Sequence, residues 1–214
     1  MREKDLKVSR RQLLTGSAIA AGLVVLGPAA TGAAASSTTS RVPSGTSAPG
    51  TSSADAYLRA FPSSHEAATT DLSGVHAEYE AAVAVFPLTL PRGYVFRTKS
   101  LASNPPGEVD VRWRVGSGGA EAFLFWAGAM ATAAYAAHNR GDAEGARAHL
   151  DSLESGYISN VGRSCVEDYE NVFVATAVQP AKNGDFDSLR RTSIAEFLSD
   201  PVSREIARNA GDIV

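Results

Sequence analysis

The chain of 214 residues contains one cysteine and few clustered bases. A single cysteine excludes an intrachain disulfide framework and any zinc or iron–sulfur site built from several thiolates of one chain. Beyond the first 35 residues no basic cluster is longer than Arg190-Arg191, so we expect no nucleic-acid partner. The motifs Gly-x-Ser-x-Gly, Ser-x-x-Lys and His-Glu-x-x-His are also missing, which leaves no complete catalytic signature of these types.

The composition that is present is typical of a globular protein, with 44% hydrophobic residues, 20% charged residues and a formal net charge of −3. The apolar run at residues 122–137 is uncharged but rich in alanine. It is shorter than the roughly 20 residues that a membrane-spanning helix needs. We therefore predict no stable transmembrane span in the mature protein.

The first 35 residues have the layout of a signal peptide. Residues 1–11 carry five Lys or Arg against two acids, and residues 13–27 are uncharged and precede Pro28. This apolar segment is too short and too weakly apolar for a permanent anchor. Small residues at Ala33 and Ala35 suit signal peptidase, which predicts cleavage before Ser36.

Within this segment, Ser9-Arg10-Arg11-Gln12-Leu13-Leu14 resembles the twin-arginine motif of exported bacterial proteins, Ser/Thr-Arg-Arg-x-Phe-Leu-Lys. Leu13 stands at the Phe position, Leu14 matches the Leu position, and Thr15 departs from the final Lys. The resemblance implies that Arg10, Arg11, Leu13 and Leu14 form the export signal, and that the twin-arginine export machinery is a partner. It further implies an extracellular or cell-envelope location.

Residues 36–54 are almost entirely Ser, Thr, Gly, Pro and Ala, which predicts a disordered linker. A single folded domain is then expected over residues 55–214, a length sufficient for one hydrophobic core. Residues 1–35 hold five of the chain's 20 bases and two of its 23 acids, so the mature chain has a net charge of −6. The predicted product is an acidic exported domain.

The fold is expected to be mainly α (α+β), a helical bundle with one β-hairpin. Apolar residues at three- and four-residue steps predict a helix over 64–86, bent at Ser73-Gly74. Strict alternation of Val109, Val111, Trp113 and Val115 with polar residues predicts a strand over about 108–115. We expect it to pair with an extended segment at about 87–98.

After Gly116-x-Gly118-Gly119, residues 119–138 are apolar on nearly every face and predict a buried central helix. Gly141 and Asp142 suit a helix end followed by a cap, and the next helix is expected to stop at Gly156. Three further features predict the helical remainder of the chain: a capping box from Ser164 to Glu167, a turn at Asn183-Gly184-Asp185, and a helix start at Asp200-Pro201.

The glycine-rich turn before the central helix fails as a dinucleotide fingerprint, because Glu121 replaces the third glycine and would repel an anion. His65 and His76 would lie about 16 Å apart along one helix, too far to share an ion. His76 and Glu80 could supply only two ligands of an incomplete site. We therefore predict no metal and no cofactor.

Two other reactive groups have simpler structural interpretations. Cys165 precedes the acids Glu167 and Asp168, which disfavour a thiolate, so a structural thiol is expected. His138 and His149 flank one predicted turn. One interpretation of this pair is a pH-sensitive contact; the simpler one is that His138, near a helix C-terminus, is favoured by the helix dipole.

These patterns favour a non-catalytic binding or assembly module at the cell surface or outside the cell, with an unidentified protein or cell-wall partner. One alternative is a small secreted hydrolase whose site is assembled only by the fold, with His76, Glu78 and Glu80 as the candidate cluster. A second alternative is a structural homo-oligomer in which Val109, Trp113 and Val115 pair across a symmetry axis.

Overall fold

The computed structural model describes residues 53–61, 68–104 and 111–213. The predicted signal peptide and all but the last two residues of the predicted linker lie outside these ranges. The same holds for the export-signal and cleavage-site residues Arg10, Arg11, Leu13, Leu14, Ala33 and Ala35. The first described helix begins at Ser53, two residues before the expected domain start.

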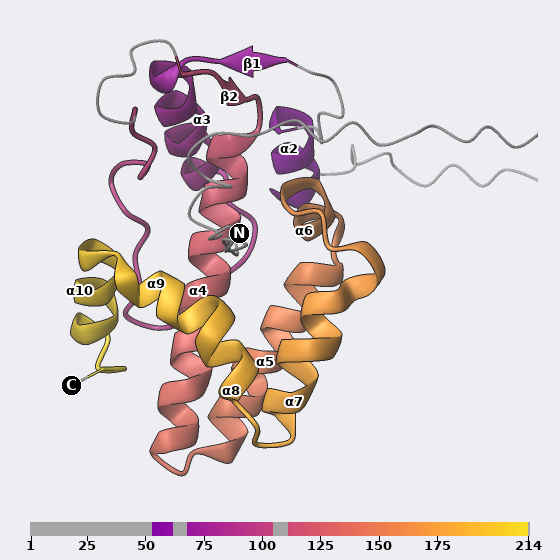
Figure 1. Ribbon diagram of the computed structural model, residues 1–214, viewed down its shortest axis with the longest axis vertical. Helices are drawn as coiled ribbons and strands as arrows, with labels where there is room; N and C mark the ends of the chain where they lie inside the picture. Colours follow the sequence, from indigo (N-terminus) through magenta and orange to yellow (C-terminus); the bar gives the residue numbers. More distant parts are fainter. Residues whose placement is uncertain (1–52, 62–67, 105–110, 214) are drawn as a thin grey trace, which may run out of the picture.

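The described part of the chain is mainly α-helical with one small antiparallel pair of strands, which confirms the predicted fold class (Figure 1). In chain order the elements are α2 (Ser53–Ala60), β1 (Thr69–Thr70), α3 (Leu72–Ala84), β2 (Trp113–Arg114), α4 (Ser117–Asn139), α5 (Ala143–Ile158), α6 (Asn160–Cys165), η1 (Tyr169–Asn171), η2 (Val174–Val178), α7 (Gln179–Lys182), α8 (Asp187–Leu189), η3 (Arg190–Ile194), α9 (Ala195–Ser199) and α10 (Pro201–Asn209).

Helix α4 is the centre of the bundle, and α3 and α5 pack along it (Figure 1). Its side chains divide between two clusters of apolar contacts. Phe123 and Trp126 belong to the larger cluster, whereas Phe125 and Ala129 pack with Phe197 of α9 in the smaller one. Because α4 is covered on most of its surface, the predicted buried central helix is confirmed.

Helix ends follow the capping chemistry of the sequence at two places. Gly141 has φ +75°, a conformation that glycine adopts without steric cost, and it ends the α4 turn. The Asp142 carboxylate then accepts a hydrogen bond of 2.8 Å from the Gly145 amide at the start of α5. Asp200 caps α10 in the same way, with Pro201 at the first helical position.

The predicted β-hairpin is wrong in its pairing partner. β2 pairs antiparallel with β1, with Thr70 opposite Trp113, and residues 87–98 form no strand. Backbone carbonyls in this segment bind side chains instead: Thr89 accepts from the Trp126 indole at 3.0 Å, and Arg97 accepts from the Tyr79 hydroxyl. Pro87 and Pro91 also cannot donate to a ladder.

Two predicted helix boundaries near the ends of long helices are also wrong. For the helix expected over 64–86, residues 64–67 lie outside the described ranges, and α3 begins only at Leu72 and ends at Ala84. Residues 69–70 are used in β1, and Asp71 caps α3 by accepting a hydrogen bond from the Gly74 amide. The helix expected to stop at Gly156 continues to Ile158. A Cβ at Gly156 would lie 2.1 Å from the Trp126 ring, so this glycine serves close packing rather than termination.

The predicted capping box at Ser164 is wrong as well. Ser164 lies inside α6, which is capped by Ser159 through a hydrogen bond from the Gly162 amide. The helical segment that follows is held at its start by Asp168, whose carboxylate accepts from the Phe173 amide at 3.1 Å. Asp168 thus binds an amide five residues further on, whereas the Ser164 hydroxyl donates to the Val161 carbonyl inside α6.

Candidate functional site

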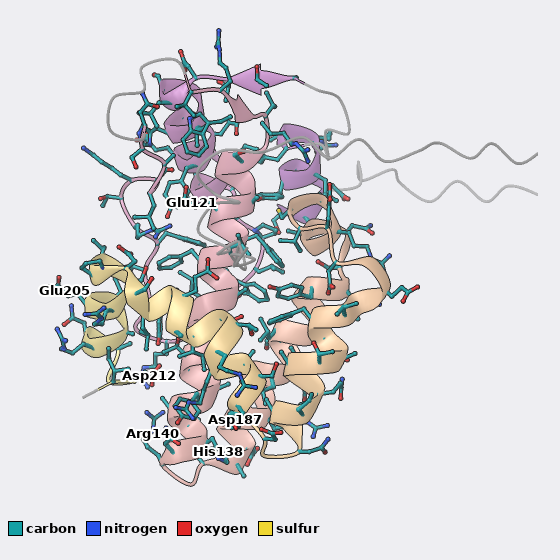
Figure 2. All side chains as sticks on the ribbon, in the orientation of Figure 1. Glu121, His138, Arg140, Asp187, Glu205 and Asp212 are labelled. Atoms are coloured by element: carbon teal, nitrogen blue, oxygen red, sulfur yellow. The ribbon has the colours of Figure 1, made fainter. Side chains whose placement is uncertain are left out.

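A buried ion-pair cluster joins three distant parts of the chain. The Arg97 guanidinium donates to the Glu121 carboxylate at 2.6 Å and to Asp200 at 3.3 Å, and these side chains are 7%, 11% and 13% exposed. The Ser100 hydroxyl and the Leu101 amide also donate to Glu121. We call Arg97, Ser100, Glu121 and Asp200 the Arg97 cluster; Figure 2 labels Glu121 on α4.

The partners of Asp200 keep its carboxylate charged. Burial raises the pKa of Asp200, but hydrogen bonds from Ser203 and the nearby Arg97 charge outweigh it, so the pKa is lowered overall. The Arg97 guanidinium also lies 5.3 Å from the centre of the Phe125 ring and 5.9 Å from that of Tyr79. The Arg97 cluster thus fastens the segment after α3 to α4 and α10.

The N-terminus of α4 is occupied by a carboxylate of the chain itself. Glu78 accepts hydrogen bonds from the amides of Gly116 at 3.0 Å and Gly118 at 3.2 Å. A Cβ at Gly118 would lie 2.4 Å from the Tyr79 backbone nitrogen, so glycine is needed for the close approach of α3 and α4. Helix N-termini favour anions, and here Glu78 is that anion.

The cluster suggested for a hydrolase does not converge. Glu78 is used at the α4 N-terminus, Glu80 is exposed, and His76 is half-buried with a buried Nδ1 that has no hydrogen-bond partner in the described ranges. His65 lies outside the described residues. Within those residues, no group of three or more His, Cys, Asp or Glu could hold a metal ion.

The remaining predicted positions have surroundings of their own. His138 is exposed and its ring lies 4.6 Å from that of Phe186, whereas His149 is half-buried and lines the groove described below. Cys165 lies 3.5 Å from the Tyr57 hydroxyl, and burial raises the pKa of its thiol, which fits the structural thiol that we expected.

The face expected to pair between subunits is covered within one chain where the structure describes it. Trp113 is 7% exposed. Val109 lies outside the described residues, and Val115 is half-buried. Little of Trp113 is therefore left for a contact with a second copy.

An open groove is the candidate binding site. Its volume is about 570 Å³, within the range of roughly 300–1,000 Å³ of small-molecule sites. It lies between the segment 87–92 and the helices α4 and α5, and its lining is mostly apolar. The helical lining residues are Trp126, Met130, Ala148, His149, Ser152, Ser155 and Gly156.

The ionisable lining of the groove is basic. Arg92 is exposed, and His149 is half-buried with a pKa that burial lowers, although Asp212 and Asp142 act in the opposite direction. The Ser152 hydroxyl donates to the Ala148 carbonyl in its own helix at 2.9 Å rather than to His149. The groove therefore presents an apolar lining with a basic edge, and its Ser152 hydroxyl is engaged by its own helix.

Sequence reasoning missed both the Arg97 cluster and the groove. The cluster partners are separated by 24 and 103 positions, and no short motif links them. One signal was available for the groove: Pro87 and Pro91 bracket the apolar residues Leu88 and Leu90, a pattern that suits an irregular segment better than a strand.

No family model matches the chain, and no match was found among the curated proteins or among the solved structures. None of the helices in the described ranges, α4 included, is both long and apolar enough to cross a membrane.

Proposed function

We propose that this chain is exported and works outside the cytoplasm as a binding module, with the groove as its ligand surface. The observation that carries the binding role is the groove itself, where Trp126 and Met130 lie beneath the prolines and leucines of the segment 87–92. Apolar surfaces with a few polar groups at the edge are typical of small-molecule sites.

The support for binding rather than catalysis comes from the side chains of the groove. Its His149 and Ser152 are three residues apart on α5, but the serine hydroxyl is bonded to its own helix. The most polar cluster, around Arg97, is buried and its charges are paired with one another. Both arrangements suit a protein that retains a ligand better than one that transfers protons.

The groove is tested by methyl NMR on the full chain, labelled at its two methionines, Met1 and Met130. Titration with 1-decanol should shift the Met130 signal saturably, because this side chain lines the groove, and leave Met1 unchanged. The variant Ser152→Trp, which fills the groove, should abolish the shift. Glu144→Trp, an exposed α5 position outside the groove, is the matched control. An unmoved Met130 signal would contradict the binding role.

Export is supported by the resemblance of residues 9–14 to the twin-arginine motif. Replacing Arg10 and Arg11 together by Lys should retain the protein in the cytoplasm, because the motif depends on the arginine pair and not on positive charge alone. Cell fractionation followed by immunoblotting measures this. Secretion at the wild-type level would show that the export route is a different one.

A further inference from the structure

Helix α10 is joined to the rest of the bundle mainly by small side chains. It lies at the edge of the molecule, beyond α9 (Figure 1). Its buried residues are Ser203 and Ala207, and Ile206 and Ala210 are only partly buried against the smaller apolar cluster. Because α10 buries little apolar surface, it should open at a lower free energy than the core of the bundle.

The preceding helix, α9, is held much more firmly. A Cβ at Gly128 of α4 would lie 2.5 Å from the Phe197 ring, so this aromatic residue occupies the space that the glycine leaves. Phe197 also packs edge-on against Phe125, with ring centres 5.2 Å apart. Asp200, which has an extended backbone, separates the two helices. It therefore lies between a helix fixed by an aromatic residue and one fixed by a serine and an alanine.

An acid at each end holds α10 in place. At the first end, Asp200 is bonded to Arg97 at 3.3 Å and to the Ser203 hydroxyl at 2.6 Å, and both members of the ion pair are buried. At the second end, Asp212 forms an ion pair of 3.1 Å with Arg140, and Figure 2 shows these two residues near the C-terminus of the described chain. The Asp212 side chain is 9% exposed, but that of Arg140 is 54% exposed. Water and salt therefore weaken the second pair more than the first.

One polar group next to α10 is left without a partner. Tyr94 is 5% exposed and packs with Ala207 in the smaller apolar cluster. Burial and the nearby charge of Asp212 raise the pKa of Tyr94, and its hydroxyl has no hydrogen-bond partner among the residues that the structure describes. A buried hydroxyl without a partner costs free energy, and hydration would remove this cost if α10 moved away.

We propose that α10 is a strap over the smaller apolar cluster, with a hinge at Asp200 and a latch formed by the Asp212–Arg140 ion pair. When the latch opens, α10 leaves and uncovers Tyr94. A free helix of nine residues is too short to persist in water, so α10 unfolds as it leaves and its amide protons exchange with solvent. The strap is independent of the groove and of export.

Residue-resolved amide hydrogen exchange, measured by NMR on the full chain at pH 7.5, compares α10 with α4. In the wild type, the amides of residues 204–210 should exchange roughly 100-fold faster than those in the middle of α4, because the strap opens without unfolding the bundle. Raising NaCl from about 0.05 M to about 1 M should accelerate exchange in α10 a further threefold or so, because salt screens the latch. Exchange in α4 should stay the same.

Asp212→Asn and Arg140→Gln remove the latch from its two sides. Each should accelerate exchange in α10 about fivefold, the gain expected for one ion pair with an exposed partner, and should abolish the effect of salt. Asp187→Asn is the matched control, because it removes a carboxylate from the exposed Arg190 and Arg191 outside α10. It should leave exchange in α10 unchanged.

Three results would overturn the strap. One is equal protection of α10 and α4 in the wild type. Another is unchanged exchange of α10 in both latch variants, or an equal acceleration in α4, since the ion pair would then hold nothing or would hold the whole bundle. The third is a gradient of exchange confined to the last amides, because this indicates fraying of the helix end rather than release of the helix.

Discussion

Arg92 and Arg97 lie five residues apart on the same irregular segment between α3 and β2, and their surroundings differ completely. Arg97 is buried close to the rings of Tyr79 and Phe125 and is bonded to Glu121 and Asp200. Arg92 is exposed at the groove and forms no ion pair in the described part of the chain. Arg97 therefore fixes the segment to α4 and α10, and the segment in turn places Arg92 at the groove.

The difference shows how a segment without regular structure can build a site. Between Phe86 and Val111 the described backbone forms no helix and no strand, so side chains fix its path. The Trp126 bond to Thr89 fixes one end of the groove wall, and Arg97 fixes the chain beyond it. Loss of the Arg97 cluster should therefore disturb the groove, whereas loss of Arg92 should not disturb the fold.

The largest effect is expected for Glu121→Gln. Removing one partner from a buried ion pair leaves a charge uncompensated and costs roughly 3–5 kcal/mol. Because Arg97, Ser100 and the Leu101 amide all donate to this carboxylate, we expect a loss of about 3 kcal/mol in the free energy of unfolding. Urea unfolding measures it as a lower midpoint at an unchanged slope.

Glu167→Gln is the matched control, because it also removes a carboxylate from an arginine. Its partner Arg114 is 3.5 Å away, and both side chains are more than 60% exposed. Surface pairs of this kind contribute less than about 1 kcal/mol. If both variants lost the same stability, the Arg97 cluster would have no special role in the fold.

Local patterns predicted the parts of the fold that local chemistry determines. The apolar run of α4 forms a buried helix because it is apolar on nearly every face, and Gly141, Asp142 and Asp200 act at the helix ends as expected. The strand alternation at 108–115 correctly marked Trp113 and Arg114, but the sequence could not reveal their partner, because β1 has only two residues.

The candidate site was harder to predict because its groups meet only after the chain folds. Glu121 was interpreted only as a residue that breaks the dinucleotide fingerprint and would repel an anion, whereas in the fold it is paired with an arginine 24 positions earlier in the sequence. Gly156 was interpreted as a helix end, whereas it is the space that the Trp126 ring occupies. In each case a long-range contact outweighs the local preference of the residue.

A smaller effect is expected from pH at His149. Burial lowers the pKa of this imidazole below its usual value of 6.5, so the unfolded chain binds a proton more readily than the folded one. The free energy of unfolding should therefore be highest above pH 6.5 and should fall as the pH drops below that value. The groups that act on His149 are Asp142, Asp212 and Arg140, and the acids oppose the burial effect.

His149→Gln should flatten this dependence, and the comparison is made by thermal unfolding of both proteins between pH 7.5 and 5.5. Asp200 and Asp151 have lowered pKa values, so their contributions to stability are lost only at a more acidic pH. They therefore do not affect the comparison between pH 7.5 and 5.5. His138→Gln is the control, because the His138 side chain is exposed and only one face of its ring lies near Phe186. An identical slope in the wild type and His149→Gln would show that another group is responsible.

The smallest effect is expected for Arg92→Gln, which tests the comparison from the other side. Arg92 is exposed and forms no ion pair in the described ranges, so its loss should change the free energy of unfolding by less than about 0.5 kcal/mol. Urea unfolding measures both this variant and Arg97→Gln. The second variant provides the contrast, because it leaves Glu121 buried without its charge partner. A large loss at Arg92 would mean that this side chain supports the groove wall itself, and its role toward a ligand could then not be separated from the fold.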